Sequence, residues 1–284
     1  MSHHLVETID LCFSYPDSPP ALNGVSLRIT HGESVAVVGG NGAGKSTLLL
    51  HLNGLLPPSS GQVRVGDIPV TPKTVARVRE SVGMVFQQAE DQLFMPTVRE
   101  DVAFGPLNMG LPPEEIRRRV EQALREVHAE ALADKMTHHL SGGEKRAVSI
   151  ATVLSMSPDI LVLDEPSANL DPASRRTLIS LLRQFTHTKI IATHDLDMVM
   201  DLCTRCIVCL LYTSEATEQF RGILKKPHTN SSRASGRDLR KRIPYLLVAT
   251  RGSRITTMPE SLLVRISRPT PCRSFRMATG TEYS

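Results

Sequence analysis

"GGNGAGKST", residues 39–47, is the stretch that decides the fold of this chain of 284 residues. From Gly39 to Ser46 it fits the pattern GxxxxGK(S/T), in which a glycine-rich turn precedes a lysine and a hydroxyl residue. A short β-branched run, "SVAVVGG" at 34–40, comes before it, and an apolar helical pattern, "KSTLLLHLNGLL" at 45–56, follows. The order strand, glycine loop, helix predicts a loop that binds phosphate at the N-terminus of a helix.

The residue types in this loop suit a nucleoside triphosphate. Glycines let the backbone turn tightly around a phosphate and aim its N–H groups at the oxygens. Lys45 is placed to reach the β- and γ-phosphates, Ser46 to ligate Mg²⁺, and Thr47 to bind the α-phosphate. The alternative is a tight turn with a structural role only. We predict an ATP site formed by Gly39, Gly40, Asn41, Gly42, Ala43, Gly44, Lys45, Ser46 and Thr47.

Three further apolar runs resemble the strand before this loop. They are "VGMVF" at 82–86, "DILVLDEP" at 159–166 and "KIIATHD" at 189–195. Each is apolar on both faces, as expected for strands of a parallel sheet that helices cover. Helical patterns lie between them, so the sequence predicts a doubly wound α/β fold with a mostly parallel sheet around the phosphate loop.

Two other parts of the chain have different patterns. Residues 5–30 and 61–70 alternate between apolar and polar, with Gly and Asn at the turns, which predicts a small antiparallel sheet. Residues of about 88–158 have mostly helical patterns and predict a helical subdomain that contains "LSGGEKRA" at 140–147. One helical run there has an apolar face formed by Ile116, Val120, Leu124 and Val127.

Acidic residues follow one of the predicted buried strands. Asp164 and Glu165 end the run "ILVLDE", and two carboxylates at a strand end need a cation or a catalytic role. We predict that Asp164 holds Mg²⁺ through water together with Ser46, and that Glu165 polarises the attacking water beside the γ-phosphate. The alternative is a solvated strand end with a helix-capping acid.

A histidine and a glutamine follow two other strands at the same predicted edge of the sheet. His194, after "KIIAT", is predicted to contact the γ-phosphate and orient Glu165 and the water, although a lone histidine is more often structural. Gln87, after "VGMVF", is predicted to touch Mg²⁺ and the water, with Gln88 as the rival for this role.

These motifs together resemble the nucleotide-binding subunits of ABC transporters. The chain has, in order, Tyr15 in "FSYPD", the phosphate loop, Gln87, "LSGGEKRA", "ILVLDEP", "SANLD" and His194, and the resemblance covers residues 5 to about 208. It implies that Tyr15 stacks on adenine and that Asp171 communicates between two sites. It also implies a head-to-tail pair of subunits, in which Ser141, Gly142 and Gly143 of one chain close over the γ-phosphate bound by the other. A second ATP-binding subunit, identical or different, is therefore an expected partner.

A narrower resemblance is to the energy-coupling-factor ATPases, with cobalt and nickel importers as the nearest subset and vitamin importers close by. It rests on the runs "VGMVFQQAEDQLFMPTVREDVAFGPLNMGL" and "EKRAVSIATVLSMSPDILVLDEPSANLDP". It implies that the segment after Gln87 docks onto a transmembrane coupling protein and that a separate protein captures the substrate. The rivals are ABC ATPases of DNA repair, which need a long coiled coil between Gln87 and Ser141, and ribosome-associated ATPases, which usually carry two such domains.

The sequence also indicates where in the cell the protein lies. Apolar runs reach only about six residues, whereas a membrane-spanning helix needs roughly 20, and "MSHHLVETID" has no apolar core of a signal peptide. We therefore expect a protein at the cytoplasmic face of the cell membrane, held there by its partner. Cys203, Cys206 and Cys209 are spaced like cluster ligands, but "RCIVCLL" is typical of a buried strand, so we expect reduced, apolar thiols.

Charge divides the chain in two. Residues 1–208 contain 19 Lys and Arg against 24 Asp and Glu, a net −5, which gives no basic surface for nucleic acid. Residues 209–284 contain 14 against 5, a net +9, with little apolar surface. The family likeness stops at "CLLYTS", which resembles one translated frame of the transposase end used in DNA library preparation. We expect an ATP-binding domain at 1–208 and a basic, disordered, non-native tail at 209–284; the alternative is a natural tail that touches anionic lipid.

Overall fold

The computed structural model describes residues 6–210 and 246–250. Two sheets organise this part of the chain. The larger has six strands in the order β10-β9-β3-β8-β7-β6, and all of its neighbouring strands run parallel. Its strands are β3 Ser34–Gly39, β6 Val82–Val85, β7 Ile160–Asp164, β8 Thr188–Ala192, β9 Arg205–Leu210 and β10 Leu246–Thr250.

The smaller sheet is antiparallel and has four strands in the order β2-β1-β4-β5. These strands are β1 Val6–Phe13, β2 Leu22–Ile29, β4 Ser60–Val65 and β5 Ile68–Pro69. Exposed and buried residues mix along β1 and β2, whereas every residue of β7 and β8 is buried. The predicted α/β fold, with a parallel sheet, a small antiparallel sheet and helices, is therefore confirmed.

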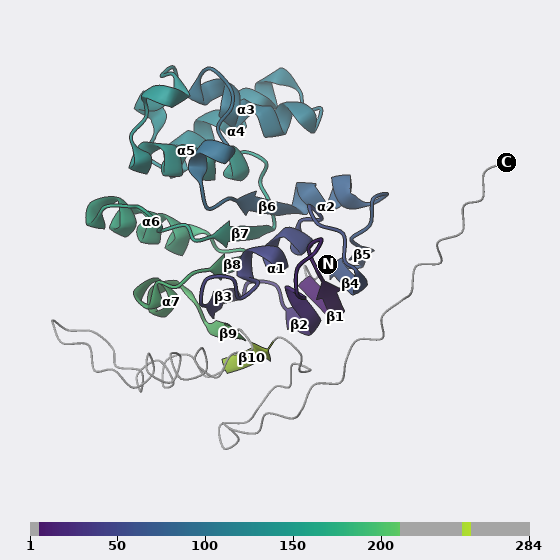
Figure 1. Cartoon of the computed structure of the whole chain (residues 1–284). Helices are drawn as coiled ribbons and strands as arrows, with labels where there is room; N and C mark the ends of the chain where they lie inside the picture. Colours follow the sequence, from purple (N-terminus) through teal and green to yellow (C-terminus); the bar gives the residue numbers. More distant parts are fainter. Residues whose placement is uncertain (1–5, 211–245, 251–284) are drawn as a thin grey trace.

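Helices surround the parallel sheet on both faces. The α-helices are α1 Lys45–Leu52, α2 Val75–Ser81, α3 Val98–Asn108, α4 Pro113–Glu126, α5 Gly142–Leu154, α6 Pro172–Gln184 and α7 Leu196–Leu202. Short 3-10 turns are η1 Ala89–Asp91, η2 Glu130–Leu132 and η3 Thr137–His139. Figure 1 shows α3, α4 and α5 grouped beyond β6, at one edge of the parallel sheet. This group lies within the range predicted as a helical subdomain.

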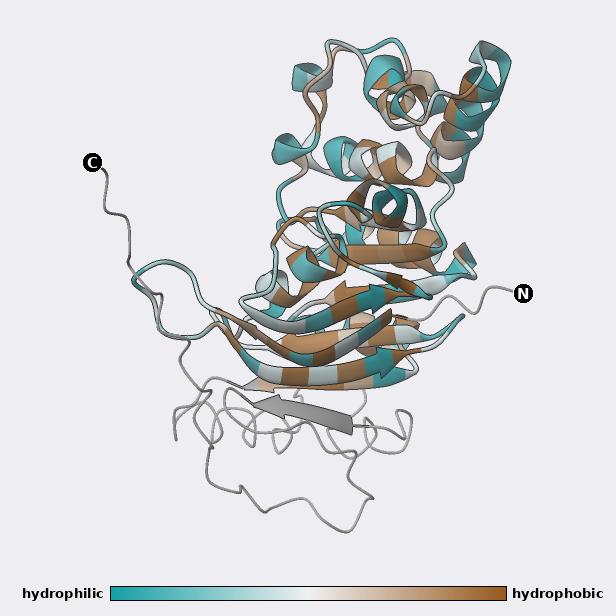
Figure 2. Cartoon of the chain, turned by 90° about the vertical axis from the view of Figure 1, so that its right-hand side faces the viewer, coloured by the Kyte–Doolittle hydropathy of each residue, from teal (hydrophilic) through white to brown (hydrophobic). Residues whose placement is uncertain are grey.

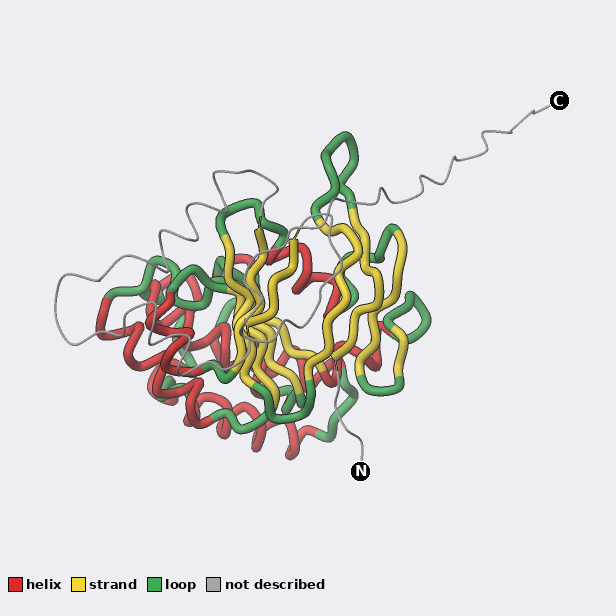
Figure 3. The backbone as a smooth tube through the Cα atoms, turned by 90° about the horizontal axis from the view of Figure 1, so that it is seen from below, coloured by secondary structure: helices red, strands yellow, loops and turns green. Residues whose placement is uncertain are grey.

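Alternate residues of the parallel strands feed two separate cores. Ala36 and Val38 of β3 pack with the helical part, α6 and α7, whereas Val35 and Val37 pack with α1 and the antiparallel sheet. The strands are accordingly apolar along most of their length (Figure 2), and most of the helical trace lies to one side of the strands (Figure 3). This double burial fixes the strand ends rigidly, because an apolar strand covered on both faces cannot slide without exposing one core.

A further strand lies in the range predicted as a basic tail. The run "RCIVCLL" is predicted as a buried strand and is observed as β9, Arg205–Leu210. Leu246–Thr250 forms β10, which pairs in parallel with β9. The short run "LLVAT" is rich in residues that favour strands, and the edge of β9 offers it backbone hydrogen-bonding groups to pair with. The other residues of the predicted tail lie outside the described part of the chain.

No helix within residues 6–210 combines the length and the apolar character that crossing a membrane requires.

Candidate functional site

The glycine loop joins β3 to α1 and leaves Lys45 at the start of the helix. Gly42 and Gly44 have φ of 75° and 87°, in the left-handed region that side chains other than glycine disfavour. A Cβ atom on Gly44 would also lie 2.7 Å from the carbonyl oxygen of Ala21. The loop therefore needs glycine at this position for both reasons, and its backbone curls in front of the N-terminus of α1 as predicted.

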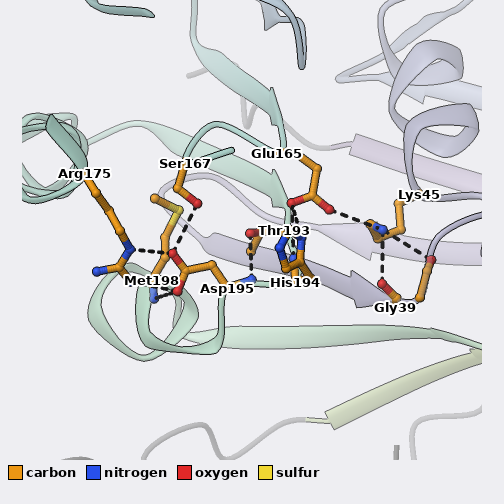
Figure 4. A network of polar contacts seen from close by, with 10 residues as sticks. Gly39, Lys45, Glu165, Ser167, Arg175, Thr193, His194, Asp195 and Met198 are labelled. Carbon is orange, nitrogen blue, oxygen red and sulfur yellow. Dashed lines mark hydrogen bonds and ion pairs between the residues drawn. The ribbon is translucent and has the colours of Figure 1, made fainter. Parts of the chain in front are cut away.

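The ammonium group of Lys45 is buried between the loop and Glu165. Its Nζ atom donates to the carbonyl oxygens of Gly39 and Gly40 at 3.1 and 3.3 Å. Glu165 Oε1 lies 3.4 Å from the same nitrogen, and the two side chains are only 7% and 8% exposed. The loop and the acidic strand end are thus joined by a buried ion pair (Figure 4).

Asp164 ends β7 beside this pair. Its carboxylate is buried and accepts a hydrogen bond from Ser46, while its Oδ1 atom has no hydrogen-bond partner among the described residues. Burial raises the pKa of Asp164 above its ordinary value, and the charge of Glu165 adds to this effect. An unsatisfied buried carboxylate oxygen next to a serine hydroxyl is a donor set that suits Mg²⁺.

Glu165 has a strained backbone and a histidine partner. Its φ is 44°, and its N–H donates to the carbonyl oxygen of Ala192 at 2.8 Å, so β8 holds it in this conformation. Its Oε2 atom lies 2.9 Å from Nδ1 of His194 and accepts from the backbone N–H of His194 at 3.3 Å. The side chain of His194 is 72% exposed and Glu165 is 8% exposed, so the histidine covers a buried carboxylate from the solvent side.

Gln87 lies beyond the end of β6, next to β7, and its side chain is exposed. No hydrogen bond joins this side chain to Asp164 in residues 6–210. The backbone here is held from α5, because Arg146 donates to the carbonyl oxygen of Phe86 at 2.7 Å and to that of Gln87. Sequence reasoning gives Arg146 no role, and a separation of about 60 residues offers no local signal for this contact.

Tyr15 lies beside the phosphate loop at Thr47. It is 41% exposed, and its hydroxyl lies 3.3 Å from Oγ1 of Thr47. The ring centroid of Phe13 lies 4.9 Å from that of Tyr15 and 4.8 Å from that of His51, and both pairs are T-shaped. Nδ1 of His51 donates to the carbonyl oxygen of Thr47 at 2.7 Å. The supporting pair Phe13 and His51 was missed, since nothing in the sequence distinguishes it from ordinary core residues.

The second glycine segment opens α5 and is separate from the phosphate loop. Ser141 caps α5: its hydroxyl accepts from the N–H of Glu144 at 3.4 Å, and Glu144 accepts from the N–H of Ser141 at 2.8 Å. Gly142 has open space around it, whereas a Cβ atom on Gly143 would lie 2.6 Å from Oγ of Ser174. The structure brings Ser141, Gly142 and Gly143 close to the start of α6, not to Lys45 of the same chain.

Asp171 caps α6 at that place. It accepts from the N–H groups of Ala173 and Ser174 at 2.8 and 3.1 Å and from the hydroxyl of Ser174 at 2.5 Å. These hydrogen bonds, that from the Ser174 side chain first, lower the pKa of Asp171 below its ordinary value. The cap is exposed, so it faces a surface of the molecule rather than the phosphate loop.

The fold and this edge of the sheet define an ATP-binding cassette. The model of the ABC transporter family matches residues 22–168, and the chain belongs to that family. A protein of Geobacter sulfurreducens, provisionally named an ABC transporter ATP-binding protein, is 66% identical over 208 residues, which are 73% of this chain and 84% of that one. The energy-coupling factor transporter ATP-binding protein EcfA of Methanocaldococcus jannaschii is 49% identical over 69% of this chain and 72% of its own.

Solved structures of ABC-type ATPases superpose on this chain. CbiO1 of Clostridium perfringens, described as part of the ABC transporter complex cbiONQ, superposes with a TM-score of 0.66 at 44% identity, over 72% of this chain and 84% of that one. The cassette MJ0796 in a dimeric post-hydrolysis state, bound to ADP and Pi, superposes with a TM-score of 0.65 at 28% identity, over 72% and 94%. The chain is therefore an ABC-type ATPase subunit of the energy-coupling-factor kind.

Proposed function

We propose that this chain binds MgATP at the strand ends of β3, β6, β7 and β8, hydrolyses it, and thereby powers import of a metal ion through a membrane partner. The observation that supports this most strongly is the joint burial of Lys45, Asp164 and Glu165 at one edge of the sheet. Three buried charged groups beside a glycine loop are costly unless a ligand uses them.

Asp164, Ser46 and Gln87 are the residues that would hold Mg²⁺. The ion would neutralise charge on the β- and γ-phosphates, which lowers the barrier to phosphoryl transfer. The unsatisfied Oδ1 atom of Asp164, and the hydrogen bond of its carboxylate with the Ser46 hydroxyl, support this assignment. Gln87 would complete the set from β6, after a movement of its exposed side chain.

Glu165 and His194 carry the hydrolytic step in this proposal. Glu165, which is buried, accepts a hydrogen bond from the attacking water and withdraws its proton. His194, at 2.9 Å, fixes the orientation of the carboxylate. Lys45 donates to the phosphates from the loop, and Tyr15 presents its exposed ring to adenine. All of these residues lie between 15 and 194.

The exposed cap of α5 completes the site from a second subunit. Ser141, Gly142 and Gly143 lie at the N-terminus of α5, where Ser141 and Gly142 are exposed, and a helix N-terminus attracts an anion. They do not face their own phosphate loop, so a head-to-tail pair of ATP-binding subunits, identical or different, gives them a γ-phosphate to bind. Asp171, beside Gly143, would connect the two sites across the pair.

The membrane partner would dock on the segment after Gln87. Phe94, Phe104 and Leu107 are 62%, 38% and 55% exposed, and the two phenylalanine rings pack edge to face at 4.7 Å. Clustered exposed aromatic residues mark a protein–protein contact. We propose that a transmembrane coupling protein binds here and holds the chain at the cytoplasmic membrane face. The substrate would be cobalt or nickel, delivered by a capture protein, by the resemblance of the sequence to cobalt and nickel importers; a vitamin is the alternative substrate.

Replacement of Glu165 by Gln tests the proposal. Turnover of ATP by the full chain should fall by about 10²–10⁴, the usual contribution of a general base, while ATP binding persists. Glu121→Gln, the same change on an exposed position of α4, is the matched control and should hydrolyse ATP like the unchanged protein. Wild-type turnover in Glu165→Gln would refute the assignment. Copurification with DNA or ribosomes, rather than with a multispanning membrane protein, would refute the transport role.

A further inference from the structure

The carboxylate of Asp195, next to His194 in the sequence, gathers donors from three elements. Arg175 of α6 donates to it through two nitrogens, at 2.6 and 2.7 Å. The Ser167 hydroxyl, from the segment after β7, donates at 3.2 Å, and the N–H of Met198 in α7 donates at 3.1 Å. Burial alone would raise the pKa of Asp195, but these bonds, Arg175 first, hold it below its ordinary value. The carboxylate is thus charged and fully engaged.

This arrangement determines where His194 lies. The backbone on its N-terminal side is fixed because the N–H of Thr193 donates to the carbonyl oxygen of Val37 in β3 at 3.1 Å. On its C-terminal side the N–H of Asp195 donates to Oγ1 of Thr193 at 3.0 Å, and the Asp195 side chain is held by Arg175. His194 itself is mostly exposed, so its placement against Glu165 depends on these two neighbours. Figure 4 shows His194 between the Arg175–Asp195 pair and the Lys45–Glu165 pair.

Arg175 also belongs to the first turn of α6. Its backbone N–H donates to the carbonyl oxygen of Asp171 at 2.9 Å, and Asp171 is the cap that lies beside Gly143. A displacement of this cap by a second subunit would therefore move Arg175, and with it Asp195. A bidentate guanidinium–carboxylate pair transmits such a movement because its geometry is fixed in two directions.

We propose that Arg175 is a positioning residue for ATP hydrolysis: its paired bonds to Asp195 hold His194 against Glu165 and connect this contact to the Asp171 cap. The inference rests on the role proposed above for His194. It assigns Arg175 no contact with ATP or with the attacking water.

A second ion pair between the same two helices provides a matched control. Arg183 of α6 pairs with Asp201 of α7 at 2.9 Å, two turns further along α6. This pair is 57% and 43% exposed and makes a single hydrogen bond, so its loss should cost little. Both Arg175→Met and Arg183→Met remove one ion pair made by α6, but only the first removes the support of His194.

The test is steady-state ATP hydrolysis by the full chain, with KM and kcat determined separately. We expect Arg175→Met to lower kcat about tenfold or more, with KM for ATP within about twofold of the unchanged protein, because the loss falls on His194 and not on binding. Arg183→Met should lower kcat by less than about twofold. If Arg175→Met does not fold, Arg175→Lys keeps the stem and the charge, removes the bidentate geometry, and should give a smaller loss of kcat of the same kind.

Combination with His194→Ala separates the two hypotheses. In a His194→Ala chain, Arg175→Met should change kcat by less than about twofold, because both changes remove the same contact. If Arg175→Met still lowers kcat tenfold in the His194→Ala chain, the inference is wrong. It is also wrong if Arg183→Met lowers kcat as much as Arg175→Met does. If His194→Ala alone hydrolyses ATP like the unchanged protein, the role proposed for His194 is wrong, whichever way Arg175 behaves.

Discussion

The Nζ atom of Lys45 lies between two backbone carbonyls and the buried carboxylate of Glu165. An ammonium group has three donors, so these acceptors already use its hydrogen-bonding capacity. A phosphate that approaches the loop must compete with Glu165 for Lys45, and it also meets the negative charge of Glu165 directly. In the proposed site, the ion pair would therefore lower the affinity for ATP.

Changes at the two ends of this pair should have opposite effects on ATP binding. Lys45→Ala removes the donor to the phosphates and should abolish tight binding. Glu165→Gln removes a competing charge and should tighten binding severalfold. Titration with a fluorescent ATP analogue measures both, with circular dichroism as the check that each variant is folded. Equal affinity in all three proteins would mean that the phosphate loop is misassigned.

The buried side chain of His51, behind the phosphate loop, makes the stability of the fold depend on pH. It is fully buried on α1, and burial lowers its pKa from the ordinary 6.5, so it stays neutral in the folded chain. As the pH falls below 6.5, the unfolded chain takes up a proton at this histidine more readily than the folded chain does. Its contribution to stability is therefore present above pH 6.5 and decreases as the pH falls towards the lower pKa of the folded state.

Replacement of His51 by Gln should flatten this part of the pH profile. Between pH 6.5 and 5.5 the free energy of unfolding of the unchanged protein should decrease as the pH falls. In His51→Gln we expect this decrease to be smaller, by up to about 1 kcal/mol per pH unit. Asp101 and Asp164, whose pKa values burial raises, act in the opposite direction in both proteins, so the difference between denaturant titrations isolates His51. His139→Gln, at an exposed position, is the control. Parallel profiles would show that His51 is not the titrating group.

At the scale of elements, the N-termini of α5 and α6 are packed against each other. Gly143 is close to Ser174, and Ser174 bonds Asp171, so the two helix caps form one surface. A Cβ atom on Gly142, one residue earlier, would meet nothing within 4 Å, so space for a side chain is free there within this chain. A side chain at Gly143 would clash within the chain. A side chain at Gly142 would fit within the chain but occupy space that a partner would need.

Replacement of each glycine by alanine should distinguish an effect on stability from an effect on dimerisation. Gly142→Ala is expected to keep the free energy of unfolding within about 0.5 kcal/mol but to weaken ATP-driven dimerisation. Gly143→Ala should push the Ser174 hydroxyl away from Asp171 and cost about 1 kcal/mol, and Ser174→Ala in the same chain should restore part of that loss by making room. Chemical denaturation and sedimentation measure the two properties. Equal effects of both alanines on stability would contradict this account.

Periodicity and motif order are enough to predict most of the elements, for a physical reason. Strands buried on both faces show as apolar runs, and the helix with its apolar face at Ile116, Val120 and Leu124 is observed as α4, Pro113–Glu126. The contacts of Arg146 with Phe86 and of Arg175 with Asp195 could not be predicted, because they join elements far apart in sequence. β10 was missed because a five-residue strand depends on the edge that β9 offers.

The whole molecule has its ATP site and its α5 cap on separate surfaces. Lys45, Asp164 and Glu165 lie at the strand ends, while Ser141 belongs to the helical group beyond β6 (Figure 1). In the proposed arrangement a single chain therefore provides two half-sites that do not meet. We propose that two chains pair head to tail, so that each ATP is bound by the loop of one chain and the cap of the other.

Mixing two inactive variants tests this claim most directly. Ser141→Arg should bind ATP but block closure of the partner's site, and Lys45→Ala should lack the loop contact in its own site. A mixed dimer then has one site that lacks both elements and one site that is intact. We predict that the mixture regains ATP-dependent dimerisation and ATP hydrolysis above the level of either variant alone. Mixtures that stay at the level of the separate variants, with both proteins folded, would contradict the head-to-tail composite site.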